Sequence, residues 1–483
     1  MPKVIDKYKK LPVQVRASLW FFVCSFLQKG ISTITTPIFT RLLNTSEYGQ
    51  YNVFNSWLGI ITIFVTLRLS MGVYAQGLVK FEEDRKKFSS SLQGLTLVLC
   101  LAWTGIYLIF KNQINNLLDL TTIQMLAMLL MLWATSVFEF WAAEKRVTYS
   151  YKSLVFLTLI VSLAKPIIGI IFVKLSTDKV TARILGLALV ELVGYTFLFF
   201  IQMRRGKQFY SAKYWKYAVL FNLPLIPHYL SLTVLNSSDR IMIKNMVGES
   251  ESGIYSLAYS LAMIMTLVNT ALSSTISPWM YQKIKAKRVQ DIARIAYITL
   301  FIIAAANIIL IAFAPEAVAI FAPKEYYDAI YCIPPVALSV FFMFCYDLFA
   351  KFEFYYEKTH YIMIASIIGA LANIGLNYIF IKAYGYIAAA YTTLFCYVFF
   401  DVMHYIFMRK VCKDYLDDVK VYDMRIIVCM SVAFSVLGFA YLATYKSTFA
   451  RYGLTIILIA IAIIKRRFIK EKLMEILSLR KKS

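Results

Sequence analysis

Long apolar segments recur along the whole chain, and they constrain its fold more than any other feature. A helix crosses the roughly 30 Å hydrocarbon core of a bilayer with about 20 apolar residues. We predict fourteen spans, at residues 17–40, 51–75, 92–110, 121–143, 154–174, 182–202, 218–238, 254–277, 296–314, 330–350, 360–382, 386–408, 423–444 and 449–464. Fourteen spans use about 280 residues, which matches a chain that is 60% hydrophobic. The sequence therefore predicts an all-α polytopic membrane protein without a soluble domain.

Basic residues are concentrated in alternate gaps between these spans. Of the 51 Lys and Arg residues, 36 lie on the side of the two termini and about 10 lie in the opposite gaps. Cytoplasmic loops retain Lys and Arg, so we expect both termini to be cytoplasmic. Topology and anionic lipid headgroups account for the net charge of +24, and nucleic acid is not an expected partner.

Motifs for enzymatic chemistry are absent from the sequence. It contains no G-x-S-x-G, no P-loop, no H-E-x-x-H and no Cys-x-x-Cys, and it has only three histidines. The predicted external gaps are too short for a folded catalytic domain. We therefore expect a transporter, with no catalytic residue, no bound metal and no cofactor other than a coupling proton or sodium ion.

Two pairs of short strings suggest an internal repeat. FWAAEK, from Phe140, closes span 4, and FYYEK, from Phe354, closes span 10; YGQY enters span 2 and SGIY enters span 8. Each pair is six spans apart, as in a parallel repeat, although chance similarity of short strings is the alternative. We predict two six-helix lobes, at residues 1–205 and 206–410, followed by two further helices and a basic tail at 411–483.

Three cations lie inside predicted spans, where charge is costly and usually faces a cavity. On span 1, Lys29 lies near mid-span in a polar stripe that follows the helical period. Arg68 lies on span 2, near an end, so its side chain could instead reach the interface. Lys165 precedes Pro166 at the middle of span 5, and either a substrate or a structural ion pair accounts for it. Neighbouring polar residues predicted to line the same path are Gln28, Ser32 and Thr36.

Acidic residues inside the spans are fewer, and they are candidates for ion coupling. Glu139, Glu191, Asp347 and Asp401 lie in spans 4, 6, 10 and 12. Asp401 and His404 are spaced i, i+3, which suggests either a polar pair at a helix end or a proton or cation relay. For Asp347, we expect a cation from a neighbouring span. The ion-coupling candidates are Glu191, Asp347, Asp401 and His404.

Span 7 contains the strongest helix-breaking signal, because proline removes backbone donors and kinks a helix. Its polar and proline residues are Asn222, Pro224, Pro227, His228, Asp239 and Arg240. A kinked polar helix at the start of the second half is typical of a gate in alternating access. The Asp239-Arg240 step could alternatively cap the outer end of the span.

The segment from Thr36 to Tyr51, TPIFTRLLNTSEYGQY, resembles the span 1 to span 2 signature of Wzx-type polysaccharide flippases. Ser238-Asp239-Arg240 followed by Gly253-Ile254-Tyr255-Ser256 resembles that family's span 7 to span 8 segment. The resemblance covers essentially the whole chain. It implies the superfamily of MATE transporters and lipid II flippases, with two lobes around a V-shaped central cavity.

The resemblance further implies outward flipping of an undecaprenyl-pyrophosphate-linked oligosaccharide repeat unit, coupled to an ion, across a bacterial cell membrane. Polymerase and chain-length machinery would be its protein partners. Basic residues in the first lobe would bind the anionic group, since Arg and Lys bind phosphate well. Arg41, inside the first signature, joins Lys29, Arg68 and Lys165 as a candidate.

Two rival functions remain at this stage. A MATE-like drug or cation antiporter predicts an acidic cavity rather than a basic one. A membrane-embedded polysaccharide polymerase predicts a long external loop with catalytic charges.

Overall fold

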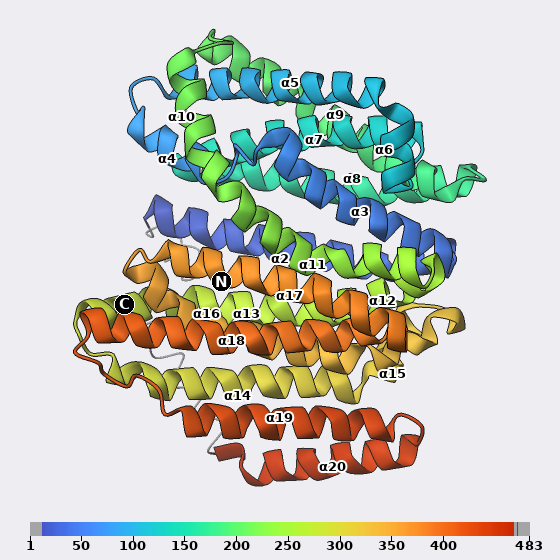
Figure 1. The fold of residues 1–483 in the computed structure, drawn as a ribbon, viewed down its shortest axis with the longest axis vertical. Coiled ribbons are helices and arrows are strands. Elements are labelled where there is room, and N and C mark those ends of the chain that lie inside the picture. Colours follow the sequence, from blue (N-terminus) through green and yellow to red (C-terminus); the bar gives the residue numbers. More distant parts are fainter. Residues whose placement is uncertain (1–11, 468–470, 472–483) are drawn as a thin grey trace, which may run out of the picture. The chain divides into compact units, whose positions relative to one another are not determined.

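The computed structural model describes residues 12–467 and residue 471, and this part of the chain contains helices and no strands (Figure 1). Its contacts divide the chain into two compact units, residues 1–237 and 238–483. The division falls inside one helix of span 7, whereas we had predicted the lobe boundary at residues 205/206, which remains a prediction.

Unit 1 is built from long helices joined by short turns. Its elements are α2 (Val13–Leu42), α3 (Thr45–Thr66), α4 (Val73–Lys80), α5 (Arg85–Ile109), α6 (Lys111–Leu118), α7 (Thr122–Val147), α8 (Tyr151–Leu175), α9 (Lys179–Gly206), α10 (Ala212–Asn222), the 3₁₀ turn η1 (Leu223–Leu225) and residues 226–237 of α11 (Ile226–Met246). Asn44 caps α3 reciprocally with Glu47, and Thr121 caps α7 in the same way with Gln124. These capping boxes satisfy free backbone donors at the helix starts.

Unit 2 is likewise built from long helices and short turns. Its elements are the end of α11, α12 (Glu249–Ala262), η2 (Met263–Met265), α13 (Thr266–Lys285), α14 (Gln290–Ala312), α15 (Ala314–Phe321), η3 (Lys324–Tyr331), α16 (Ile333–Tyr355), α17 (Thr359–Tyr384), α18 (Ala388–Tyr415), α19 (Met424–Thr444) and α20 (Thr448–Ile464). Helices α14, α19 and α20 run side by side (Figure 1).

The described residues contain twelve helices, counting α10–α11 and α12–α13 as one each, that are long and apolar enough to cross a membrane. The other two predicted spans correspond to α3 and to α20, which is shorter. The protein is therefore an all-α, multi-pass membrane protein with about fourteen spans, as the sequence predicted. Short helices α6 and α15 occupy gaps that we had treated as simple loops.

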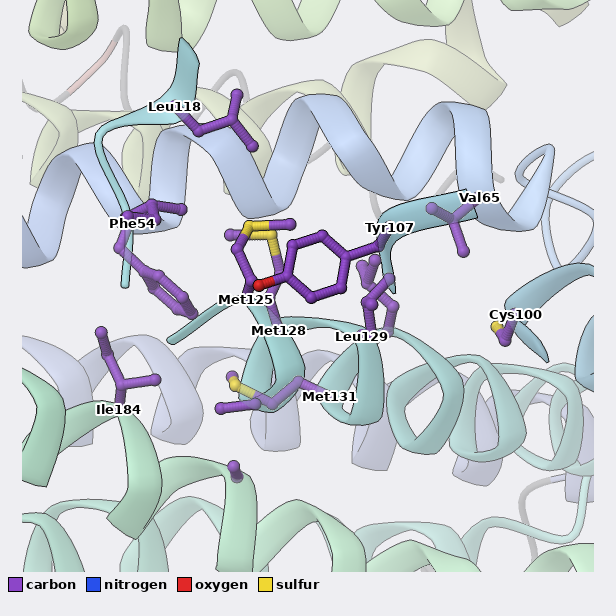
Figure 2. Packing of buried hydrophobic residues seen from close by; sticks show 14 of the residues in the cluster. Phe54, Val65, Cys100, Tyr107, Leu118, Met125, Met128, Leu129, Met131 and Ile184 are labelled. Atoms are coloured by element: carbon purple, nitrogen blue, oxygen red, sulfur yellow. The ribbon is translucent and has the colours of Figure 1, made fainter. Parts of the chain in front are cut away.

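Helices of unit 1 pack against one another through a cluster of buried apolar side chains. Tyr107 lies among Met125, Met128 and Leu129 of α7, with Phe54 of α3 beside the same cluster (Figure 2). The Tyr107 hydroxyl donates to the Asn115 side chain at 3.0 Å. Buried Tyr needs such a partner, and the contact ties α6 to the end of α5.

The predicted repeat has a structural counterpart at the turns that follow α7 and α16. Tyr149 and Glu357 are left-handed, with φ of 54° and 56°. In both turns the next residue donates its N–H to the carbonyl five residues earlier, at 2.8 Å, as in a Schellman motif. Gly49 and Gly253 likewise lie at the same position from the starts of α3 and α12.

One of the two predicted pairs of similar strings does not align when the two turns are superimposed by sequence position. Glu144 lies inside α7, five residues before Tyr149, whereas Glu357 is itself the left-handed residue. The turns therefore pair Tyr149 with Glu357, and the two Glu-Lys strings are not equivalent.

Candidate functional site

The polar stripe of α2 is exposed for much of its length. Gln28 donates to the hydroxyl of Ser162 on α8 at 3.2 Å, and the Thr36 hydroxyl donates to the carbonyl of Ser32. Lys29 is exposed, and among the described residues its ammonium group has no hydrogen-bond or ion-pair partner. Lys29 is thus an unneutralised cation on a membrane-spanning helix.

Arg68 lies at a break in span 2 that the sequence did not predict. Span 2 was expected to run unbroken over residues 51–75, but α3 ends at Thr66 and α4 begins at Val73. We call residues 67–72 the elbow. Leu67, Arg68 and Gly72 have φ of 50°, 49° and 63°, a region that non-glycine residues rarely adopt.

Buried Asn222 holds the elbow in place from the end of α10. Its Nδ2 donates to the carbonyls of Leu67 at 2.9 Å and Arg68 at 2.8 Å. The guanidinium of Arg68 donates to the sulfur of Met71 at 3.5 Å. Arg68 therefore has no carboxylate partner among the residues that the structure describes. Ser70, also in the elbow, donates to the carboxylate of Glu139 on α7.

The prolines of span 7 break the helix as predicted. Pro224 lies in η1 and Pro227 follows at the start of α11. His228 is half-buried, and its Nδ1 is buried without a hydrogen-bond partner. The helix then continues to Met246. Asp239 consequently lies inside α11, so it does not cap the end of the span, which was one of our two interpretations.

Lys165 and Glu191, predicted for different roles, form an ion pair with each other. Lys165 Nζ lies 2.6 Å from Glu191 Oε1, and Thr135 donates to the other carboxylate oxygen at 3.0 Å. The side chain of Glu191 is 7% exposed and that of Lys165 is 32% exposed. The pair connects α8 with α9, and a structural role is therefore sufficient to account for it.

Arg41 lies at the end of α2, where its guanidinium donates to the carbonyl of Pro37 at 2.8 Å. A cation in the last turn of a helix interacts favourably with the free carbonyls there.

Asp347 has a cationic partner, but not from a neighbouring span as we expected. Lys351, one turn further along α16, binds the carboxylate of Asp347. Ser273 on α13 donates to the same carboxylate at 2.7 Å. Lys351 was assigned to a cytoplasmic loop in our sequence analysis, whereas the structure places it in α16 with a side chain 4% exposed.

His404 pairs with Glu353 rather than with Asp401. His404 Nδ1 lies 2.9 Å from Glu353 Oε1, and both side chains are almost completely buried. Asp401 is also buried, and its Oδ1 has no hydrogen-bond partner within the described part of the chain. The i, i+3 spacing on α18 therefore does not produce a contact between Asp401 and His404.

Asp239 is the centre of a buried polar cluster in unit 2. It is 2% exposed, and its carboxylate accepts from Tyr255 at 2.6 Å, Asn377 at 2.6 Å and Thr393 at 2.8 Å. Neighbouring Arg240 lies over the ring of Tyr259, 4.5 Å from its centroid. The sequence indicated Asp239, but it did not indicate these partners, which come from α12, α17 and α18.

A further buried oxygen adjoins this cluster. Asn373 Oδ1 accepts from Ser238 at 3.0 Å and from Asn377 at 3.2 Å. The searched part of the chain contains no group of three or more His, Cys, Asp or Glu residues that could hold a metal ion. Carboxylate, amide and hydroxyl oxygens of this kind suit a hard cation without cysteine or histidine ligands.

Residues 15–284 match the family model described as polysaccharide biosynthesis protein, and residues 224–379 match the MatE model. The chain belongs to the polysaccharide biosynthesis protein family. The Lsg locus putative protein 1 of Haemophilus influenzae is 22% identical over 383 residues, which are 73% of this chain and 88% of that protein. An uncharacterized membrane protein of the same organism is 21% identical over 375 residues, 75% of this chain and 89% of that protein.

Solved structures place the fold of this polysaccharide biosynthesis family member among MOP-superfamily transporters. The lipid II flippase MurJ, in an inward closed conformation, has a TM-score of 0.64 at 17% identity, covering 93% of this chain and 99% of that chain. An inward-facing multidrug resistance MATE family transporter of the MOP superfamily has a TM-score of 0.60 at 13% identity, covering 81% and 96%. At these identities the similarity concerns the fold.

Proposed function

We propose that this protein is a flippase that moves an undecaprenyl-pyrophosphate-linked oligosaccharide repeat unit to the outer leaflet of a bacterial cell membrane, for surface polysaccharide synthesis. It works by alternating access, with both termini cytoplasmic and without covalent chemistry on its substrate. Membership of the polysaccharide biosynthesis family supports the substrate class, and the fold shared with MurJ supports movement of a lipid-linked molecule.

The proposal depends on one observation, that two cations of unit 1 are not neutralised by the protein. Lys29 and Arg68 lie on or between spanning helices and have no carboxylate partner among the described residues. Isolated charges in a membrane usually face a substrate path, and a pyrophosphate would neutralise both cations. A drug antiporter for cations would instead require an excess of unpaired carboxylates over unpaired cations there. The predicted acidic candidates Glu191 and Asp347 each have a lysine partner.

Replacing Lys29 tests this proposal. In a strain that lacks the chromosomal gene, Lys29→Ala should abolish export of the surface polymer, whereas Lys29→Arg should retain much of it because the charge is kept. Lys152→Ala is the matched control, since Lys152 is exposed at the start of α8. All variants are first compared for their amount in the membrane. Normal polymer in the Lys29→Ala strain would refute the assignment.

We also propose that flipping is coupled to a cation at the Asp239 cluster. Asp239, Asn373 and Thr393 bring carboxylate, amide and hydroxyl oxygens close together in the interior of unit 2, where the Asn377 amide group donates to both Asp239 and Asn373. The negative charge of the Asp239 carboxylate would balance the positive charge of a sodium ion or a proton bound there. In proteoliposomes, a sodium jump at constant pH and a pH jump at constant sodium separate the two ions. Asp239→Asn should remove the response to the coupling ion, and an unchanged response would refute this role.

A further inference from the structure

Helices α13 and α16 of unit 2 pack against each other, and each carries polar and aromatic side chains at intervals of four residues. On α13 these are Ser273, Ser277 and Tyr281, and on α16 they are Asp347, Lys351 and Tyr355. Residues four apart lie on one face of a helix. Contacts join the two faces, because Ser273 donates to the Asp347 carboxylate at 2.7 Å and the ring centroids of Tyr281 and Tyr355 lie 5.8 Å apart. We call these six residues the α13–α16 polar stripe.

Asp347 is one of the few accessible positions on an otherwise enclosed helix. Within residues 333–353 of α16, every residue other than Met343, Tyr346 and Asp347 is buried. The side chain of Asp347 is 34% exposed. A charged side chain on a membrane-spanning helix is costly against lipid and usually faces water or a polar ligand. The accessible part of α16 therefore faces a polar environment rather than lipid tails.

Lys351 neutralises the Asp347 carboxylate and has no donor to spare. Its ammonium group carries three donors, and it contacts three acceptors, which are Oδ2 and the backbone carbonyl of Asp347 and the hydroxyl of Ser273. The side chain of Lys351 is 4% exposed. An anion would meet the carboxylate without a free cation, and a cation would find the carboxylate charge already balanced. The stripe therefore favours neither kind of ion.

Two acceptor oxygens are left over at the stripe. Ser273 and Lys351 both donate to Asp347 Oδ2, and no donor of the described residues lies within hydrogen-bonding distance of Oδ1. One turn before Ser273 on α13, Asn269 donates through Nδ2 to the carbonyl of Val340 at 2.8 Å, and its own Oδ1 is buried without a partner in the described part of the chain. Such oxygens bind hydroxyl or amide donors, and a hydrogen bond to a charged oxygen is roughly twice as strong as one between neutral groups.

Tyr281 and Tyr355 supply aromatic surface two turns beyond the carboxylate. Both residues are half-buried, and Tyr281 interacts electrostatically with Asp347. Tyr355 in turn contacts Tyr356, with 5.0 Å between the ring centroids. A tyrosine ring presents an apolar face to the C–H groups of a sugar ring, while its hydroxyl stays available for hydrogen bonds. A neutralised carboxylate beside aromatic rings thus suits a neutral ligand rich in hydroxyl groups.

We propose that the α13–α16 polar stripe binds the oligosaccharide of the flippase substrate, with Asp347 accepting from a sugar hydroxyl and Tyr281 and Tyr355 packing against a sugar ring. This role rests on the proposed function, which assigns the pyrophosphate to cations of unit 1. Tyr281 and Tyr355 lie near the ends of α13 and α16 that we expect to be cytoplasmic. The stripe therefore meets the sugar on the side from which the substrate is moved.

The test compares two lipids on the full-length protein in lipid nanodiscs. One is the undecaprenyl-pyrophosphate-linked oligosaccharide extracted from cells that lack the chromosomal gene, and the other is undecaprenyl pyrophosphate without sugar. The ratio of their dissociation constants isolates the contribution of the sugar. A hydrogen bond to a charged group corresponds to about tenfold in affinity or more, so the wild type should bind the sugar-bearing lipid about tenfold more tightly.

Two variants remove the sugar contacts in different ways. Asp347→Leu/Lys351→Met replaces the ion pair by apolar side chains of similar size, an exchange that proteins often tolerate, and Tyr281→Ala removes a ring without changing the pair. Both should bind the two lipids equally. Unchanged affinity for undecaprenyl pyrophosphate is the check on folding, and where one variant fails this check the other decides. Tyr281→Phe keeps the ring and should behave as the wild type does, as should Tyr378→Ala, which replaces an exposed tyrosine of α17 outside the stripe.

The outcomes separate the sugar site from the proposed function. A wild type that binds both lipids equally overturns the sugar site, as does a tenfold preference retained by a correctly folded variant. If neither lipid binds the wild type, the proposed function fails, and the free oligosaccharide released from the lipid by mild acid decides the stripe alone. Binding of this free sugar to the wild type and its loss in Tyr281→Ala would support the site, whereas no binding, or equal binding to both proteins, would overturn it.

Discussion

The ion pair between Lys165 and Glu191 allows structural and substrate-binding roles to be separated by experiment. Breaking a buried pair by removing one partner costs about 3–5 kcal/mol, whereas an exposed pair is worth about 0–1 kcal/mol. Glu191 is 7% exposed and Lys165 is 32% exposed, with 2.6 Å between Nζ and Oε1. Because the lysine is only partly buried, we expect Lys165→Ala to lower the free energy of unfolding by about 2–3 kcal/mol.

Most of that cost comes from the Glu191 charge left without its cation. Glu191→Gln removes the charge and keeps an acceptor for Thr135. The double variant Lys165→Ala/Glu191→Gln should therefore recover about 2 kcal/mol relative to Lys165→Ala alone. Reversible unfolding in mixed detergent and SDS micelles, followed by tryptophan fluorescence, measures these differences. A double variant no more stable than Lys165→Ala would refute the electrostatic reasoning.

Polymer export by the same variants then assigns the role of Lys165. If Lys165 only neutralises Glu191, the double variant restores export together with stability. If Lys165 also binds the anionic substrate, the double variant is stable in the membrane but inactive. Lys152→Ala, on an exposed part of the same helix, should change neither property.

The same unfolding assay tests three further sites. Asn222→Ala removes two hydrogen bonds to the elbow and should cost about 2 kcal/mol; an unchanged stability would contradict its assigned role. A Cβ at Gly206 would lie 2.1 Å from the carbonyl oxygen of Lys86, whereas one at Gly105 meets nothing within 4 Å. Gly206→Ala should therefore lower the free energy of unfolding by about 1–3 kcal/mol, whereas Gly105→Ala should leave it unchanged. Equal effects of the two substitutions would be inconsistent with this packing. His404→Ala leaves Glu353 buried without a partner and should cost about 3 kcal/mol, most of which Glu353→Gln should restore in the double variant.

The membrane spans were predictable because apolar length and basic gaps are local properties of the sequence. The break in span 7 was predictable for the same reason, since Pro224 and Pro227 remove backbone donors wherever they occur. The elbow was not. Residues 67–72 contain no proline, and the left-handed Leu67 and Arg68 are held by Asn222, which is more than 150 residues away in the chain.

Side-chain pairing was the least predictable feature of the candidate site. The i, i+3 spacing of Asp401 and His404 suggested a contact, but the packing of α18 against α16 brings Glu353 to His404 instead. Lys351 lies just beyond residue 350, where we predicted the end of span 10. The structure continues α16 to Tyr355 and buries the lysine. In both cases the choice of partner depends on the register between helices, which no single segment encodes.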